Sequence, residues 1–199
     1  MHSNFPSPAK TALKDESQAS HKKAWRLAGI ASLLLSLMSC ASHPLEVVRN
    51  EKPVFKPERF FAGRTKSWGV FENKSGQPTK LIYTETTGRW DGKALHFEQA
   101  IDIPQGKKSH RSWLIQPLDE HHYSVTGTDI IGVAHGETSG NAFHLEFTID
   151  ALPGNPLGHL HMSQWMYLQP DGVTLINRDH LTKAGLFVTA ATEQFRRVR

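Results

Sequence analysis

The sequence lacks the features that mark disulfide-stabilised, membrane-spanning or nucleic-acid-binding proteins. Only one of its 199 residues is a cysteine, so no disulfide can form within the chain. The uncharged apolar stretch at residues 27–37 has about eleven residues, whereas a membrane-spanning helix needs about 20. Of the 23 basic and 19 acidic residues, five and two precede residue 40, which leaves 18 and 17 in the remainder. This nearly neutral body gives no electrostatic reason to expect nucleic acid.

The first 40 residues have the order of an export signal. A basic patch at residues 21–26 precedes the apolar stretch, which ends in Leu37-Met38-Ser39-Cys40. This ending resembles the bacterial lipobox, in which the thiolate of the cysteine accepts a diacylglycerol. We therefore expect cleavage before Cys40 and lipid attachment at Cys40. Two alternatives are a buried cysteine at the end of a core helix and an ordinary signal for soluble export.

The predicted placement of the chain follows from this signal. Residue 41 is Ala rather than Asp, and in enteric-like bacteria Asp at that place retains lipoproteins in the inner membrane. We therefore expect an envelope lipoprotein, held by lipid on the outer membrane and facing the periplasm. We divide the chain into a signal peptide with a polar leader at 1–39, a tether at 40–57 and a folded domain at 58–199.

Turn signals recur about every ten residues in the folded domain, and the segments between them are rich in Thr, Val, Ile, Tyr, Phe and Trp. This spacing is typical of an all-β sandwich or barrel. The turn signals are Asn73–Gly76, Asp91-Gly92, Pro104–Gly106, Pro153–Pro156 and Pro170–Gly172.

Apolar and polar residues alternate within these segments. Phe143, Leu145 and Phe147 point to one face, and His144 and Glu146 point to the other. The stretch at 160–168 alternates in the same way, with Gln164 on the same face as its apolar members. We therefore predict an antiparallel meander of about nine or ten strands after an N-terminal signal helix. A lipocalin-like barrel is our first choice, and a β-sandwich is the alternative.

Seven strings of residues are distinctive when they occur together in one order. They lie at residues 60–63, 68–71, 88–92, 128–137, 140–142, 165–168 and 175–178. Together they resemble the DUF3833 family of bacterial lipoproteins. The resemblance covers residues 55–197 and implies a lipocalin-like or calycin-like body of no established activity.

Catalytic and metal-binding patterns are weak in this sequence. It holds no Gly-x-Ser-x-Gly nucleophile motif and no phosphate-binding glycine loop. His159 and His161 share a strand face but give at most half of a zinc site, which needs three or four ligands. Asp129, His135 and Glu137 could form a general acid/base group, although they could equally be solvent-exposed polar residues without a catalytic role. We expect no enzyme, no metal and no cofactor.

Tryptophans are the residues best suited to line a ligand cavity. We predict Trp68, Trp90, Trp113 and Trp165 as ligand-binding residues, with Arg178 near a ligand head group. The alternative is that the tryptophans fill the core and that Arg178 covers a tryptophan ring at the barrel end. Arg89, Arg111 and Asn177 could also meet a carboxylate or phosphate. The sequence therefore predicts a barrel that binds or carries a hydrophobic small molecule such as a fatty acid or lipid. The alternative is a packed envelope scaffold that holds no ligand and docks a protein partner.

Overall fold

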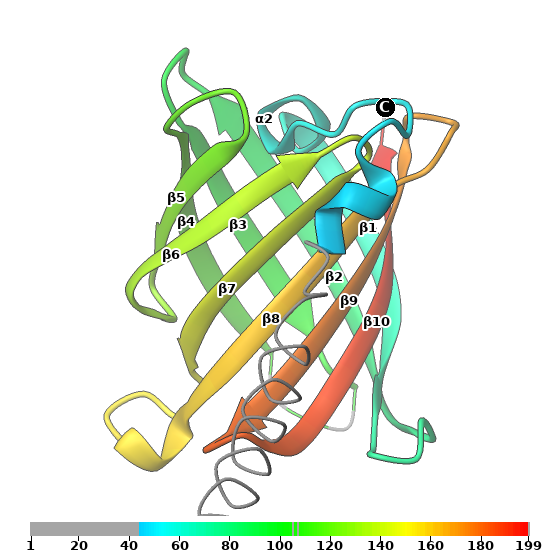
Figure 1. The fold of residues 1–199 in the computed structure, drawn as a ribbon. Coiled ribbons are helices and arrows are strands. Elements are labelled where there is room, and N and C mark those ends of the chain that lie inside the picture. Colours follow the sequence, from blue (N-terminus) through cyan, green and yellow to red (C-terminus); the bar gives the residue numbers. More distant parts are fainter. Residues whose placement is uncertain (1–43, 105, 107, 199) are drawn as a thin grey trace, which may run out of the picture. The chain divides into compact units, whose positions relative to one another are not determined.

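The computed structural model describes residues 44–104, 106 and 108–198, and ten antiparallel strands account for most of them (Figure 1). Three short helices accompany the strands, and none in this part of the chain is long and apolar enough to cross a membrane. The helices are η1 (Pro44–Val48), α2 (Pro57–Phe60) and η2 (Pro156–Gly158). The strands are β1 (Gly63–Glu72), β2 (Pro78–Trp90), β3 (Leu95–Asp102), β4 (Ser109–Pro117), β5 (His122–Gly127), β6 (Ile130–Ser139), β7 (Ala142–Asp150), β8 (His159–Leu168), β9 (Thr174–Lys183) and β10 (Leu186–Val198).

The strands form one closed barrel. Each strand pairs with the next along the chain, and β1 pairs with β10, so no strand is left as a free edge. The prediction of an antiparallel meander that closes into a barrel is confirmed, and the sandwich alternative is wrong. The predicted signal peptide at 1–39 and the predicted lipid attachment at Cys40 lie outside the described residues.

The hairpin between β2 and β3 shows how the local sequence turns the chain. Gly92 has a φ of 95°, which a residue with a side chain rarely adopts. The Asp91 carboxylate accepts hydrogen bonds from the backbone N–H groups of Lys93 and Ala94, both at 2.9 Å. The hydrogen bond from the Ala94 backbone N–H, followed by those from the His96 side chain and the Lys93 backbone N–H, holds the pKa of Asp91 below its usual range. The hairpin predicted from the Asp91-Gly92 pair is therefore present.

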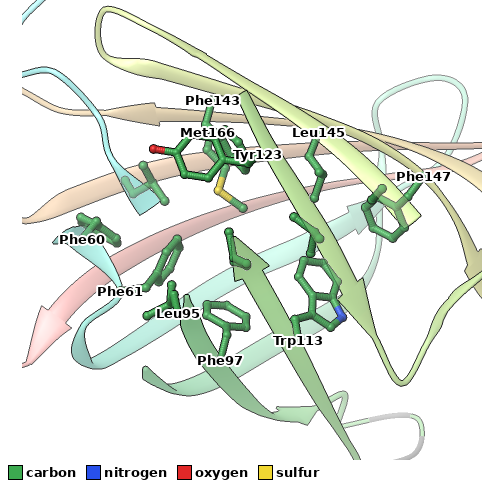
Figure 2. Packing of buried hydrophobic residues seen from close by; sticks show 14 of the residues in the cluster. Phe60, Phe61, Leu95, Phe97, Trp113, Tyr123, Phe143, Leu145, Phe147 and Met166 are labelled. Atoms are coloured by element: carbon green, nitrogen blue, oxygen red, sulfur yellow. The ribbon is translucent and has the colours of Figure 1, made fainter. Parts of the chain in front are cut away.

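Strand alternation determines which side chains enter the barrel. Phe143, Leu145 and Phe147 on β7 are buried in the core, whereas the exposed Glu146 lies on the other face. Figure 2 shows the β7 side chains packing with Trp113, Tyr123 and other buried residues. The predicted alternation is confirmed on this strand, and it forms an apolar interior.

One end of the barrel is covered by three phenylalanines, Phe55, Phe60 and Phe61, which we call the aromatic cap. Phe61 meets Phe60 edge to face at 4.9 Å between ring centroids and meets Phe97 at 5.0 Å. A Cβ atom at Gly88 would lie 2.0 Å from the Phe61 carbonyl oxygen, so β2 needs a glycine where the cap crosses it. Burial of Phe55 shows that part of the segment expected to act as a tether packs into the core.

Candidate functional site

Polar residues occupy a large part of the barrel interior. Their strands run together around the closed sheet, from β8 through β9, β10, β1, β2 and β3 to β4. Strands β5–β7 instead contribute mostly apolar side chains to the same interior. The interior thus has a polar side and an apolar side, and ligand sites in proteins combine these two kinds of surface. We call the polar set the interior polar cluster: Ser67, Thr84, Thr86, Gln99, Arg111, Gln164, Asn177, Asp179 and Glu193.

Glu193 on β10 is a buried carboxyl group inside this cluster. Its Oε2 atom accepts a hydrogen bond from Ser67 Oγ at 2.6 Å and another from Thr84 Oγ1 at 3.2 Å. Burial raises the pKa of Glu193, and the hydrogen bond from Ser67 and the charge of Arg111 oppose this rise. The two hydroxyl groups hold the carboxyl group in place beside β1 and β2.

Asp179 on β9 is a second buried carboxyl group and is only 7% exposed. Its Oδ2 atom accepts a hydrogen bond from Asn177 Nδ2 at 2.9 Å. Burial, followed by the negative charge of Glu193, raises the pKa of Asp179 to about 7, whereas the charge of Arg111 opposes the rise. Asp179 therefore changes its protonation state near neutral pH.

Three buried acceptor atoms near Asp179 have no hydrogen-bond partner in the described structure: Gln164 Oε1, Asn177 Oδ1 and Asp179 Oδ1. Gln164 stands directly opposite Asp179 in the β8–β9 register, and Asn177 lies two residues from Asp179 on the same face of β9. A buried acceptor without a donor is unfavourable by about 1–3 kcal/mol. The cluster therefore holds several acceptors that a bound molecule could satisfy.

Arg111 is fixed in place on the opposite part of the polar side. Its Nε atom donates to Gln99 Oε1 at 2.6 Å, and its Nη1 atom lies 3.5 Å from Asp129 Oδ2. Its guanidinium group lies 4.5 Å from the ring centroid of Trp113, and Trp113 Nε1 donates to Asp129 Oδ1 at 2.6 Å. Arg111 thus offsets the negative charge of Asp129, and its positive charge also acts on the two buried carboxyl groups, Asp179 and Glu193.

Replacement of Asp179 by asparagine should change how stability depends on pH. Because the pKa of Asp179 is raised in the fold, protonated Asp179 stabilises the protein at low pH, and this contribution is lost as pH rises toward 7. The Asp179→Asn variant should therefore gain on the order of 2 kcal/mol of unfolding free energy at pH 8 and gain nothing near pH 4. Urea unfolding at pH 4–8 measures this difference. An Asp179→Asn difference that stays constant with pH would contradict it, and Glu120→Gln on the surface is the control.

The five residues predicted to bind ligand do not surround one cavity. Trp113 is buried inside the barrel, whereas Trp68 is 49% exposed, Trp90 is 37% exposed at the end of β2, and Arg178 is exposed. Trp165 alternates with the buried Gln164 and therefore lies on the outer face of β8. Strand alternation puts Trp68, Trp165 and Arg178 on outward positions, and Trp90 lies at the end of its strand, so of the five only Trp113 lies in the core; ligand binding by these residues stays a prediction.

Three of the five predicted ligand-binding residues line two surface grooves of the barrel wall. Trp165 and Arg178 line a groove of about 290 Å³, where Trp165 stacks on His144 at 4.0 Å between ring centroids. Trp68 lines a second groove of about 500 Å³ over β1–β4 with Tyr83. The outer wall therefore offers exposed aromatic surface. The lining of the first groove also includes Asp179 of the interior polar cluster, and that of the second includes Ser67 and Thr84.

Other residues considered for chemistry are spread apart. Asp129 contacts Arg111 and Trp113 rather than His135, which is exposed on β6. Among residues 44–198, as far as they are described, no three His, Cys, Asp or Glu side chains gather where they could hold a metal ion.

The sequence interpretation missed the two buried acids. The immediate neighbours of Asp179 and Glu193 in the chain are polar, so neither acid stands in an apolar run. A weak signal was present, since Gln99 and Gln164 stand two residues from inward-facing apolar residues and therefore share their strand face. Extending the same alternation along β9 from Leu175 would have placed Asn177 and Asp179 inside.

Comparison with known proteins agrees with this architecture. An S-type phycobiliprotein lyase from Guillardia theta has a similar structure, with a TM-score of 0.51 and 14% sequence identity. The similarity covers 73% of this chain and 94% of the lyase, and at this identity it establishes a shared lipocalin-like barrel fold. No curated protein matches the sequence. The sequence profile of the family of proteins of unknown function DUF3833 matches residues 34–197. Because that match spans most of the chain, this protein belongs to the DUF3833 family.

Proposed function

We propose that this protein is a non-catalytic binding protein that holds a hydrophobic small molecule, such as a fatty acid or a lipid, inside its barrel. The observation that carries the proposal is the set of unpartnered buried acceptors on Gln164, Asn177 and Asp179, which share the barrel interior with a large apolar cluster. A barrel that served only as a packed scaffold would gain stability by replacing these polar groups with apolar ones.

The composition of the interior supports this proposal. The apolar side offers aromatic and aliphatic surface from Phe143, Leu145 and Phe147, and the polar side offers a few fixed hydrogen-bonding groups. Small β-barrels of the lipocalin type use this division to hold one ligand. The similarity to a phycobiliprotein lyase is in keeping with a barrel that receives a small hydrophobic molecule.

We further propose that Cys40 carries lipid and holds the protein on the outer membrane, with the barrel in the periplasm. The basic patch, the apolar stretch and the lipobox-like ending support this part of the proposal. An anchored barrel would stand close to membrane-derived ligands, which raises their local concentration.

Labelling with radioactive palmitate tests the anchor. We expect the wild-type chain expressed in its bacterial host to take up label and to sediment with membranes. The Cys40→Ser variant should take up no label, because it lacks the thiol that accepts the lipid. Equal labelling of wild type and Cys40→Ser, or no labelling of either, would contradict acylation at Cys40.

Native mass spectrometry of the full chain, purified from its own host in neutral detergent micelles, tests ligand binding. We expect a bound mass of a few hundred daltons that survives exchange into a second detergent, because the ligand is enclosed by the barrel. Organic extraction followed by fragmentation should identify the molecule. A chain that stays without ligand after host purification and after incubation with fatty acids and other lipids would contradict the proposal.

A second candidate function is docking of an envelope protein on the outer wall. The exposed Trp68 and the groove beside Trp165 favour this alternative. A Trp165→Ala substitution would weaken docking and leave ligand retention unchanged, since Trp165 faces outward. Crosslinking of wild-type and variant chains in cells, with ligand retention measured in parallel, separates the two functions.

A further inference from the structure

We propose that the interior polar cluster selects an apolar molecule whose head group donates hydrogen bonds through N–H or O–H, as an amine or alcohol does, and disfavours a free carboxylate. This inference rests on the proposed binding function and narrows the class of ligand. It is carried by the unpartnered acceptors and by the balance of charge inside the barrel.

Acceptors outnumber donors where Gln164, Asn177 and Asp179 meet. Each of these side chains is more than nine-tenths buried, and each has an oxygen atom without a hydrogen-bond partner. The Asn177 amide nitrogen is already used by Asp179 Oδ2, and the Gln164 side chain also hydrogen-bonds the Asp179 carboxyl group. A head group that brings N–H or O–H donors would satisfy these oxygens, whereas a carboxylate would bring further acceptors to the same place.

The charges that face Asp179 favour the same class of ligand. Glu193 from β10 is a second carboxyl group, and both are buried. Arg111 from β4 supplies positive charge, but it already contacts Gln99 and Asp129. A bound carboxylate would therefore meet two acids and an arginine that has other partners, whereas an ammonium group would meet complementary charge.

The acceptors also lie next to apolar surface, so an amphiphile could span both. Gln164 is paired across the sheet with Leu145 of β7 on one side and with Asp179 of β9 on the other. Met162 and Met166 precede and follow Gln164 on the inner face of β8. A head group at Asp179 would thus place its hydrocarbon chain against β7 and β8.

Competition between ligands that share one hydrocarbon chain tests the inference. The full chain in neutral maltoside micelles is incubated at pH 7.5 with equal amounts of decylamine, decanol and decanoate, and native mass spectrometry measures the occupancy by each ligand. We expect decylamine and decanol each to exceed decanoate by about tenfold or more, since a hydrogen bond to a charged group corresponds to at least that factor.

Variants connect this preference to the cluster. Asp179→Asn should lower decylamine occupancy by about tenfold and leave decanol within about twofold, because asparagine keeps the shape and removes the charge. Glu193→Gln provides a second test in case Asp179→Asn fails to fold. The surface substitution Glu120→Gln removes the same charge outside the barrel and should change nothing. Lowering the pH to 5 should reduce the decylamine preference of the wild type, since Asp179 becomes protonated.

The possible outcomes separate this inference from the proposed function. Binding of decanoate as strongly as decylamine and decanol would overturn the inference and leave ligand binding intact. An amine preference that persists in both Asp179→Asn and Glu193→Gln would also overturn it, because the preference would then arise elsewhere. Failure of every ligand to bind to a folded chain would overturn the proposed function itself.

Discussion

Phe61→Ala should lower the free energy of unfolding by about 3–5 kcal/mol. Phe61 is 1% exposed and contacts Phe60, Phe97 and Phe195 edge to face. Removing its ring leaves a cavity between the aromatic cap and the barrel, which the closed sheet cannot fill by moving one strand. Urea unfolding followed by circular dichroism measures the loss.

A matched surface substitution separates packing from general loss of apolar area. Leu186 is 74% exposed at the start of β10, so Leu186→Ala should change the unfolding free energy by less than about 0.5 kcal/mol. If Phe61→Ala were as mild as Leu186→Ala, the aromatic cap would not be part of the cooperative core. The proposed enclosure of ligand at that end of the barrel would then lose its physical basis.

Arg111→Met should destabilise the protein by about 2–4 kcal/mol near neutral pH, and the loss should grow as pH rises. Methionine fills much of the volume but removes the donor to Gln99 Oε1 and the charge beside Asp129. Arg111 also opposes the rise in pKa of Asp179 and Glu193, so its removal makes ionisation of both acids less favourable. Because both pKa values are already raised in the fold, the additional loss appears as pH increases from about 4 to 8.

Arg49→Met is the control for Arg111→Met. Arg49 pairs with Glu46 at 3.0 Å on the surface, where solvent weakens the interaction, so its loss should be below about 1 kcal/mol and nearly constant with pH. Unfolding of both variants in urea at several pH values gives the comparison. An Arg111→Met deficit that is independent of pH would mean that Arg111 acts on Asp129 and Gln99 alone.

Membership of the DUF3833 family and the lipocalin-like fold establish the architecture of this protein but assign it no activity. The chemically distinctive feature is instead the pair of buried acids, Asp179 and Glu193, in a barrel that is otherwise suited to an apolar ligand. Such a pair reduces stability at neutral pH, since both carboxyl groups are removed from water. A bound partner for these groups is the explanation that we propose.

The sequence by itself determined where the chain turns between strands and which side chains of several strands face the core. Apolar alternation at 143–149 required Phe143, Leu145 and Phe147 to face inward. Asp91-Gly92 formed the turn between β2 and β3 through contacts within four residues. These features depend on neighbours in the chain, so they can be read without knowledge of the fold. Turn spacing and alternation also favoured a barrel over a sandwich, the family resemblance implied the same fold, and the closed sheet confirms it.

The tertiary structure alone decided which residues share the candidate site. The distance along the chain from Ser67 to Glu193 is 126 residues, and closure of β1 onto β10 brings their side chains to 2.6 Å. Trp68 and Arg178 were plausible as ligand contacts by residue type, but the face of each strand put them outside. Alternation with Leu175 and Leu181 on β9, and with Ala191 and Phe195 on β10, marks Asp179 and Glu193 as inward positions, but only the closed sheet shows that both acids share one interior.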